Sequence, residues 1–249
     1  MNIIISGAAG RMGKELARLA SESYRNANAV AGFDIAPVTD NAFPIYSDWN
    51  AVGEKADCIV DFSHHAATHA LLEYAVKTNT PVVLATTGHT EEELAEIREA
   101  AEKIPVFHSA NMSLGIALLA ELAKMTAKAM PDADIEIVEK HHNRKLDSPS
   151  GTALLLANAI RSVRNAATFM FSRNGNARRT KEEIGIHAIR MGNIVGEHEI
   201  IVGTDTQTIT LKHEAHSRSL FAEGSLAAAE FLVGKPAGLY DMNRMVRGE

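Results

Sequence analysis

Short apolar runs alternate with helical patterns along the first part of the chain. Each run is rich in β-branched residues, which is typical of strands that are buried on both faces of a parallel sheet. The runs are 2–6, 29–34, 58–63, 81–85 and 104–107. Amphipathic segments lie between them, at 14–20, 65–78 and 91–103, and Thr90-Glu91-Glu92-Glu93 has the form of a capping box. Regular alternation of strand and helix predicts a doubly wound α/β domain over about the first 110 residues.

The pattern changes after residue 111. Residues 114–130 are apolar on more than one face and predict a long helix, and 135–139 alternate as a strand does. A helix at 153–160 comes next. Three further strands are expected at 184–190, 194–203 and 207–214, with hairpin connections at 191–193 and 204–206. These elements predict a second domain of α+β character with a mixed or antiparallel sheet, before a last helix at 219–232.

Composition narrows the class of protein. The 249 residues are 46% apolar and 22% charged, with a net charge of -6, which argues against nucleic acid as the main partner. The single cysteine, Cys58, lies in an apolar run, so a buried packing thiol in a reducing compartment is expected. We find no signal peptide and no apolar run near the ~18 residues that span a bilayer. We therefore expect a soluble, cytoplasmic protein without a membrane partner.

The first strand runs into the turn Gly7-Ala8-Ala9-Gly10-Arg11-Met12-Gly13, and a helix follows. The glycines suit a tight turn, a close backbone approach to a pyrophosphate and close helix–strand packing. A purely structural turn has the same composition. The next strand, however, ends at Asp34, about 20 residues on, where a carboxylate takes the adenosine ribose hydroxyls. Together these features predict a Rossmann-type dinucleotide-binding domain.

The same region bears on the choice of dinucleotide. Residues 35–39, after Asp34, contain no Arg or Lys to neutralise a 2′-phosphate, which favours NADH. Arg11 and Lys14 beside the glycine turn could still reach a phosphate, so the preference for NADH over NADPH is mild. Thr86-Thr87-Gly88, at the end of another strand, suits a nicotinamide ribose or amide, and a simple turn is an equal alternative.

The stretch from Glu139 to Ala153 carries the densest chemistry. His141 is followed by the cation Lys145, and Ser150-Gly151-Thr152 precede a helix whose first amides and dipole attract an anion. An imidazole, a cation and an anion cradle form a site that can hold and protonate a small carboxylate. A hydrogen-bonded structural histidine is the alternative for His141 taken alone.

The paired histidines do not predict a metal site. His141 and His142 point to opposite faces of a strand end, so they cannot serve one ion from there. His65 and His69 are four apart on a helix, but the glutamate of a His-Glu-x-x-His motif and a third ligand are missing. We expect no metal.

Several stretches together resemble one enzyme family, the dihydrodipicolinate (4-hydroxy-tetrahydrodipicolinate) reductases of bacterial diaminopimelate and lysine biosynthesis. The resemblance covers essentially the whole chain, and the segment 139–153 is its most specific part. The matching stretches are 7–13, 61–63, 86–88, 109–113, 139–153, 196–198, 217–218 with 221–222, and 238–242.

The resemblance implies NAD(P)H-dependent reduction of 4-hydroxy-tetrahydrodipicolinate, a cyclic dicarboxylate, to tetrahydrodipicolinate with loss of water. It also implies a homotetramer built through the sheet of the second domain, and a C-terminal helix and tail that return to the first domain. The expected domains are 1–111 with 219–249 for the dinucleotide, and 112–218 for the substrate and for tetramerisation.

The resemblance also implies roles for individual residues. His141 is similar to the family's catalytic acid and Lys145 to its partner. The implied contacts to the substrate carboxylates are His142, Ser150, Gly151, Thr152 and Arg218. The implied cofactor positions are Gly7, Ala8, Ala9, Gly10, Arg11, Met12, Gly13, Asp34, Phe62, Ala85, Thr86, Thr87, Ala110, Asn111 and Met112.

Three departures from the family pattern remove no reacting group. Ala85 replaces the usual glycine, Ser148 the usual alanine, and Met191 a small residue. Two other functions are compatible with a two-domain chain of this kind: an amino-acid or semialdehyde dehydrogenase, and a dinucleotide-sensing regulator. A regulator would have no need for His141 and Lys145, and the chain shows no basic helix-turn-helix.

Overall fold

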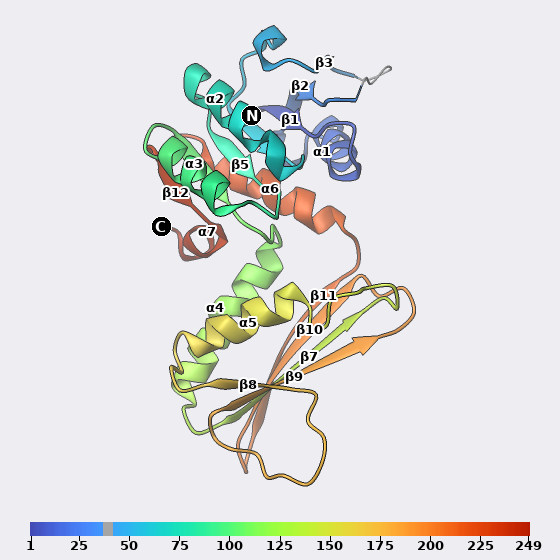
Figure 1. The fold of residues 1–249 in the computed structure, drawn as a ribbon, viewed down its shortest axis with the longest axis vertical. Coiled ribbons are helices and arrows are strands. Elements are labelled where there is room, and N and C mark those ends of the chain that lie inside the picture. Colours follow the sequence, from blue (N-terminus) through green and yellow to red (C-terminus); the bar gives the residue numbers. More distant parts are fainter. Residues whose placement is uncertain (37–41) are drawn as a thin grey trace. The chain divides into compact units, whose positions relative to one another are not determined.

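The computed structural model describes residues 1–36 and 42–249, which form two compact units (Figure 1). Unit 1 comprises Met1–Ser113 and Ser219–Glu249, and unit 2 comprises Leu114–Arg218. Unit 2 is therefore an insertion between two segments of unit 1, and each unit has its own sheet.

Unit 1 is built on a parallel sheet with the strand order β12-β6-β5-β4-β1-β2-β3. Its strands are β1 (Asn2–Ser6), β2 (Asn28–Phe33), β3 (Ile45–Tyr46), β4 (Cys58–Asp61), β5 (Val82–Leu84), β6 (Pro105–His108) and β12 (Gly238–Tyr240). The strand order reverses between β1 and β4. In an open parallel sheet, ligands bind beyond the carboxyl ends of the strands at such a point.

Helices cover both faces of this sheet. They are α1 (Arg11–Ser21), α2 (Thr68–Thr78), α3 (Glu91–Ala101), α6 (Ser219–Leu232) and α7 (Met242–Arg247), with 3-10 turns at Tyr24–Asn26, Trp49–Ala51 and His65–Ala67. Side chains of α2 and α3 pack on one face, in a cluster with Ile4, Ile59 and Val82. Helices α1 and α6 contact each other, and α6 also contacts β4, β5 and β6. The predicted doubly wound domain is confirmed, and Thr90 forms the expected capping box.

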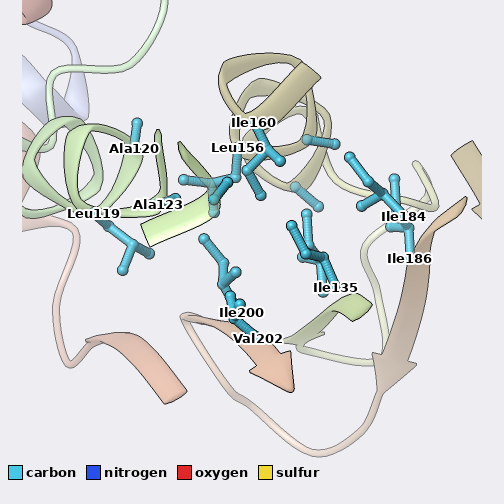
Figure 2. Packing of buried hydrophobic residues seen from close by; sticks show 14 of the residues in the cluster. Leu119, Ala120, Ala123, Ile135, Leu156, Ile160, Ile184, Ile186, Ile200 and Val202 are labelled. Atoms are coloured by element: carbon cyan, nitrogen blue, oxygen red, sulfur yellow. The ribbon is translucent and has the colours of Figure 1, made fainter. Parts of the chain in front are cut away.

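Unit 2 has a five-stranded mixed sheet in the order β11-β10-β7-β9-β8. Its elements are α4 (Leu114–Ala129), β7 (Asp134–His141), α5 (Gly151–Arg161), β8 (Thr168–Phe171), β9 (Glu183–Arg190), β10 (Gly196–Gly203) and β11 (Thr208–Ala215). Figure 2 shows side chains of α4 and α5, such as Leu119 and Leu156, meeting the strand residues Ile135, Ile186 and Ile200. Burial of each such isoleucine contributes roughly 1.5–3 kcal/mol.

The prediction that residues 191–193 form a hairpin connection is wrong, because β9 and β10, which they join, do not pair with each other. Strand β7 lies between β9 and β10, parallel to β9 and antiparallel to β10. The connection instead crosses the end of β7, where Met191 N–H donates to the His141 carbonyl (3.0 Å) and His142 N–H to the Ile194 carbonyl (2.8 Å). The turn that joins β9 to β10 therefore fixes the backbone at the two histidines. The hairpin expected at 204–206 joins β10 to β11, as predicted.

Other differences are short elements. The sequence patterns did not predict β3, the 3-10 turn at Trp49–Ala51, β8, β12 or α7. Residues 37–41, which include part of the stretch behind the NADH prediction, lie outside the described residues. Cys58 is fully buried, and burial raises the pKa of its thiol. Within the described residues, no helix is both long and apolar enough to cross a membrane.

Candidate active site

Glu139 and His141 lie on the buried face of β7, because residues two apart in a strand point to the same side. The exposed fraction is 0% for Glu139 and 8% for His141. His141 Nδ1 lies 2.5 Å from Glu139 Oε2. An ionised carboxylate only accepts hydrogen bonds, so Nδ1 carries the proton of this contact and Nε2 is left to exchange a proton with a ligand.

Arg190, at the end of β9, holds the same carboxylate from a second strand. Its Nη1 donates to Glu139 Oε2 (2.8 Å) and its Nη2 to Oε1 (2.7 Å). The Ser150 amide also donates to Oε1, at 3.0 Å. Burial alone would raise the pKa of Glu139, but the hydrogen bonds from His141, Arg190 and Ser150 outweigh it and lower the pKa to about 2. Glu139 is therefore ionised near neutral pH.

Ser150 is the N-cap of α5. Its hydroxyl accepts the Ala153 N–H at 3.1 Å, and the same oxygen lies 3.1 Å from His198 Nε2. The Ser150 amide, which was expected to help attract an anion, donates its N–H to Glu139 in this structure. Ser150 is 2% exposed. As the N-cap, it fixes the start of the helix whose first residues are Gly151 and Thr152.

His198, on β10, lines the other side of His141. The two rings meet edge to face, with 5.2 Å between centroids and an angle of 74° between planes. Burial, together with the charge of His141, lowers the pKa of His198 to about 4, so this ring is neutral at pH 7. Its Nδ1 is buried without a hydrogen-bond partner among the described residues. A neutral ring here adds no positive charge beside His141.

Gly196, at the start of β10, leaves room beside the reactive nitrogen. A Cβ atom at this position would lie 3.1 Å from His141 Nε2, which is closer than ordinary van der Waals contact. The absence of a side chain therefore keeps space next to Nε2.

Lys145 and Asp147 form an ion pair on the loop between β7 and α5. Lys145 Nζ lies 2.7 Å from Asp147 Oδ1, and the exposed fractions of their side chains are 22% and 58%. The hydrogen bond from Lys145 lowers the pKa of Asp147, and the backbone of Gly151 contributes to the same shift. Lys145, the predicted cation, and Gly151, part of the predicted anion cradle, thus both contact the carboxylate of Asp147.

His142 and Arg218 also lie in this cationic region. Partial burial, followed by the charges of Arg144, Arg218, His141 and Lys145, lowers the pKa of His142. Its Nδ1 is buried and makes no hydrogen bond within the described residues. Several positive groups near one neutral histidine favour an anionic ligand.

In unit 1, the glycine turn lies against the end of β4. Gly7 has φ +78°, and a Cβ atom there would lie 2.6 Å from the Phe62 carbonyl oxygen. A Cβ atom at Gly13 would lie 2.2 Å from the Gly7 carbonyl oxygen. Helix α1 then begins at Arg11, with Gly10 as its N-cap. The close packing and the helix start fit a bound pyrophosphate.

Asp34 closes the turn from the next strand. Its Oδ2 accepts the Ala9 N–H at 2.8 Å and its Oδ1 accepts the Ala36 N–H at 3.0 Å. The carboxylate is half-buried and therefore reachable. Its place beyond the end of β2 fits the ribose hydroxyls of an adenosine.

The remaining predicted cofactor residues follow the ends of neighbouring parallel strands. Ala85, Thr86 and Thr87 follow β5, and Ala110, Asn111 and Met112 follow β6. Thr86 is buried and its hydroxyl donates to Asp61 at 2.6 Å, whereas Thr87 and Ala110 are exposed. Met112 is 2% exposed. Of these predicted residues, Thr87 and Ala110 are therefore accessible to solvent, whereas Thr86 and Met112 are buried.

Family models of the two halves of one enzyme match this chain. The model of the N-terminal part of dihydrodipicolinate reductase matches residues 1–112, and that of the C-terminal part matches residues 115–246. The chain belongs to the dihydrodipicolinate reductase family.

Curated relatives and a solved structure agree with this assignment to the dihydrodipicolinate reductases. The 4-hydroxy-tetrahydrodipicolinate reductase of Caldanaerobacter subterraneus subsp. tengcongensis is 47% identical, over 99% of this chain and 98% of the relative. That of Clostridium novyi is 45% identical over the same shares. A dipicolinate-bound dihydrodipicolinate reductase from Paenisporosarcina sp. TG-14 has a TM-score of 0.82 at 25% identity and covers 97% of both chains. The family resemblance found in the sequence is confirmed.

His65 and His69, which were weighed as a pair of metal ligands, contact two different carboxylates. His65 Nδ1 lies 2.9 Å from Glu93 and His69 Nδ1 lies 3.1 Å from Glu96. Over residues 1–36 and 42–249, no group of three or more metal-binding side chains comes together.

Sequence reasoning assigned no role to Glu139, Arg190, Gly196 or His198. One signal was present: Glu139 and His141 are two apart on a strand, so a charged residue shares the buried face with the candidate acid. The pairing of Glu139 with Arg190 spans 51 residues and follows from the parallel register of β7 and β9, which the sequence did not reveal.

Proposed function

We propose that this chain reduces 4-hydroxy-tetrahydrodipicolinate to tetrahydrodipicolinate, with loss of water, in diaminopimelate and lysine biosynthesis. Identity of 47% to a curated reductase over almost the full length supports this activity. The observation that carries the chemistry is the His141 imidazole, held by the ionised Glu139 and set beside the cationic loop of Lys145.

The chain's own residues act on the ring and its carboxylates. A bound nicotinamide dinucleotide supplies a hydride for ring carbon C4 of the dehydrated substrate. Addition of hydride at C4 shifts the electrons of the conjugated imine toward the neighbouring carbon C3. Nε2 of the protonated His141 gives its proton to C3, and the imidazole of His141 becomes neutral. Lys145, Gly151 and Thr152 hold one carboxylate and stabilise the developing charge. His142 and Arg218 add donors for the dicarboxylate.

Binding of the substrate requires Asp147 to leave its present partners. Its carboxylate contacts Lys145 and the Gly151 backbone, the same groups that we assign to the substrate. Asp147 is more than half exposed, so water can solvate it when a ligand carboxylate takes its place.

A reconstituted assay tests the activity. Dinucleotide oxidation should require the condensation product of pyruvate and aspartate semialdehyde, supplied by the synthase reaction, and should not occur with amino acids or semialdehydes alone. Turnover of an amino acid, with none of the condensation product, would favour the dehydrogenase alternative.

For the dinucleotide, we propose that NADH binds at least as tightly as NADPH. The support is Asp34, whose carboxylate is fixed beside the glycine turn and suits free ribose hydroxyls better than a 2′-phosphate. Calorimetric titration of both dinucleotides measures the ratio. A strong preference for NADPH would mean that Arg11 or Lys14 dominates.

We further propose a cytoplasmic homotetramer that assembles through the sheet of unit 2. The support is the family resemblance, together with the alternation along β7 and β10, where every second residue is buried against the helices and the residues between them stay accessible. Sedimentation analysis of the purified chain gives the mass of the assembly. A monomer at micromolar concentration would reject the proposal.

A further inference from the structure

We propose that Glu139 and Arg190 are a positioning pair for the proton donor. Glu139 selects the nitrogen of His141 that exchanges the proton and places a negative charge beside the ring, whereas Arg190 offsets that charge and ties the network to the carboxylate-binding loop. The inference rests on the proposed role of His141 as the acid.

The pair occupies the centre of a buried network. Both oxygens of Glu139 accept two hydrogen bonds: Oε2 from His141 and Arg190, and Oε1 from Arg190 and Ser150. Every partner donates, so the carboxylate is held in its ionised form and cannot rotate without breaking contacts. A buried charge that is fully paired in this way is costly to assemble and adds little to stability by itself, which points to a role in the site.

The same network reaches each part of the proposed chemistry. Glu139 binds His141, the acid, and the Ser150 amide at the start of α5. Arg190 Nη2 also donates to the Asp147 carbonyl at 2.8 Å, in the loop that carries Lys145. Acid, helix start and cationic loop are thus fixed relative to one another through one carboxylate and one guanidinium.

The charges around His141 give the pair a distinctive signature. Glu139 faces the ring from its own strand, Arg190 faces the carboxylate from β9, His198 packs against the ring from β10, and Lys145 lies on the following loop. Glu139 attracts the proton on His141, and Arg190 repels it. Removal of one or the other should move the titration of His141 in opposite directions, whereas loss of packing alone would not produce opposite signs.

Titration of the labelled full-length protein without substrate tests the pair directly. The chain has 11 histidines, so the His141 signal is assigned by its absence in His141→Gln. In Glu139→Gln, which keeps the side-chain shape, we expect the midpoint of the His141 titration to fall, because the negative charge beside the ring is lost. In Arg190→Gln we expect the midpoint to rise.

Kinetics provide the second readout. The kcat of Glu139→Gln should fall ~10–10²-fold, which is the scale expected for a misplaced proton donor. In the pH profile of kcat, the decrease on the alkaline side should begin at a lower pH than in the wild type. The KM for the dinucleotide should not change, because the network lies in unit 2. The control is Glu96→Gln, the same exchange in the exposed pair with His69, which should match the wild type.

Two results would overturn the inference. One is a folded Glu139→Gln whose His141 titration and kcat match the wild type, and the other is a shift of the same sign in both variants. If Glu139→Gln does not fold, Arg190→Gln decides alone, because an unchanged or lowered midpoint contradicts the proposal. The titration needs no substrate, so an inactive wild-type protein would reject the proposed function and leave this test intact.

Discussion

Asp34 in unit 1 and Glu139 in unit 2 both accept the backbone amide of a turn, but in opposite surroundings. Asp34 in unit 1 is half-buried and accepts the amides of Ala9 and Ala36. Glu139 in unit 2 is 0% exposed and binds His141 and Arg190 as well as the Ser150 amide.

The difference reflects what each site has to do. The glycine turn recognises a ligand with backbone groups and steric fit, so its single carboxylate can remain exchangeable with solvent. The end of β7 must hold a proton at one nitrogen, which requires fixed charges in a water-poor place, where electrostatic interactions are strong. Substitutions in the two regions should therefore change different quantities.

The largest effect is expected at the end of β7. His141→Gln and Lys145→Ala should each lower kcat by ~10²-fold or more, since a positioned proton donor and its charged partner are lost. Calorimetry should find the dinucleotide Kd unchanged in both.

The control for this change is His69→Gln, which removes an exposed histidine from unit 1. Turnover close to wild type in both His141→Gln and Lys145→Ala would remove the acid assignment. A higher dinucleotide Kd in either variant would contradict the expectation that substitutions at the end of β7 leave dinucleotide binding unchanged.

A smaller effect of the opposite kind is expected at the glycine turn. Gly7→Ala should weaken dinucleotide binding about tenfold or more, because a non-glycine residue at positive φ costs about 1–3 kcal/mol and its Cβ atom would collide with the Phe62 carbonyl. The His141 titration should stay at its wild-type midpoint.

Gly53→Ala is the matched control, because a Cβ atom at Gly53 would have no heavy atom of the described residues within 4 Å, apart from its chain neighbours. An unchanged dinucleotide Kd in Gly7→Ala would show that the turn has no role in binding. Dinucleotide binding can be measured without any substrate.

The smallest effect concerns stability against pH. His198 has its pKa lowered to about 4 by burial, so between pH 6.5 and 4 the unfolded chain binds a proton that the folded chain does not. The free energy of unfolding should therefore fall as the pH falls, by about 1 kcal/mol between pH 7 and pH 5.5. Glu139, with a pKa lowered to about 2, adds a further loss below pH 4.5.

Urea unfolding at the two pH values measures this dependence. His198→Gln should flatten it, whereas His216→Gln, at an exposed histidine of the same unit, should keep it. Equal slopes in wild type and His198→Gln would mean that other groups carry the dependence.

Local patterns predicted much of unit 1. The apolar runs, the glycine turn and the capping box at Thr90 depend on neighbouring residues, and the structure contains all of them. Unit 2 was harder, because an alternating strand has the same pattern whether its partner precedes or follows it. The position of β7 between β9 and β10 therefore escaped prediction, and so did the contact of Arg190 with Glu139 that this order creates.

The insertion of unit 2 between β6 and α6 has a consequence for synthesis on the ribosome. Leu114–Arg218 is continuous, so unit 2 can complete its contacts as soon as it emerges. Unit 1 must wait for residues 238–240, because β12 pairs with β6 and covers what would otherwise be an open sheet edge. A nascent chain halted before β12 should therefore carry a protease-resistant unit 2 beside a unit 1 that still depends on chaperones.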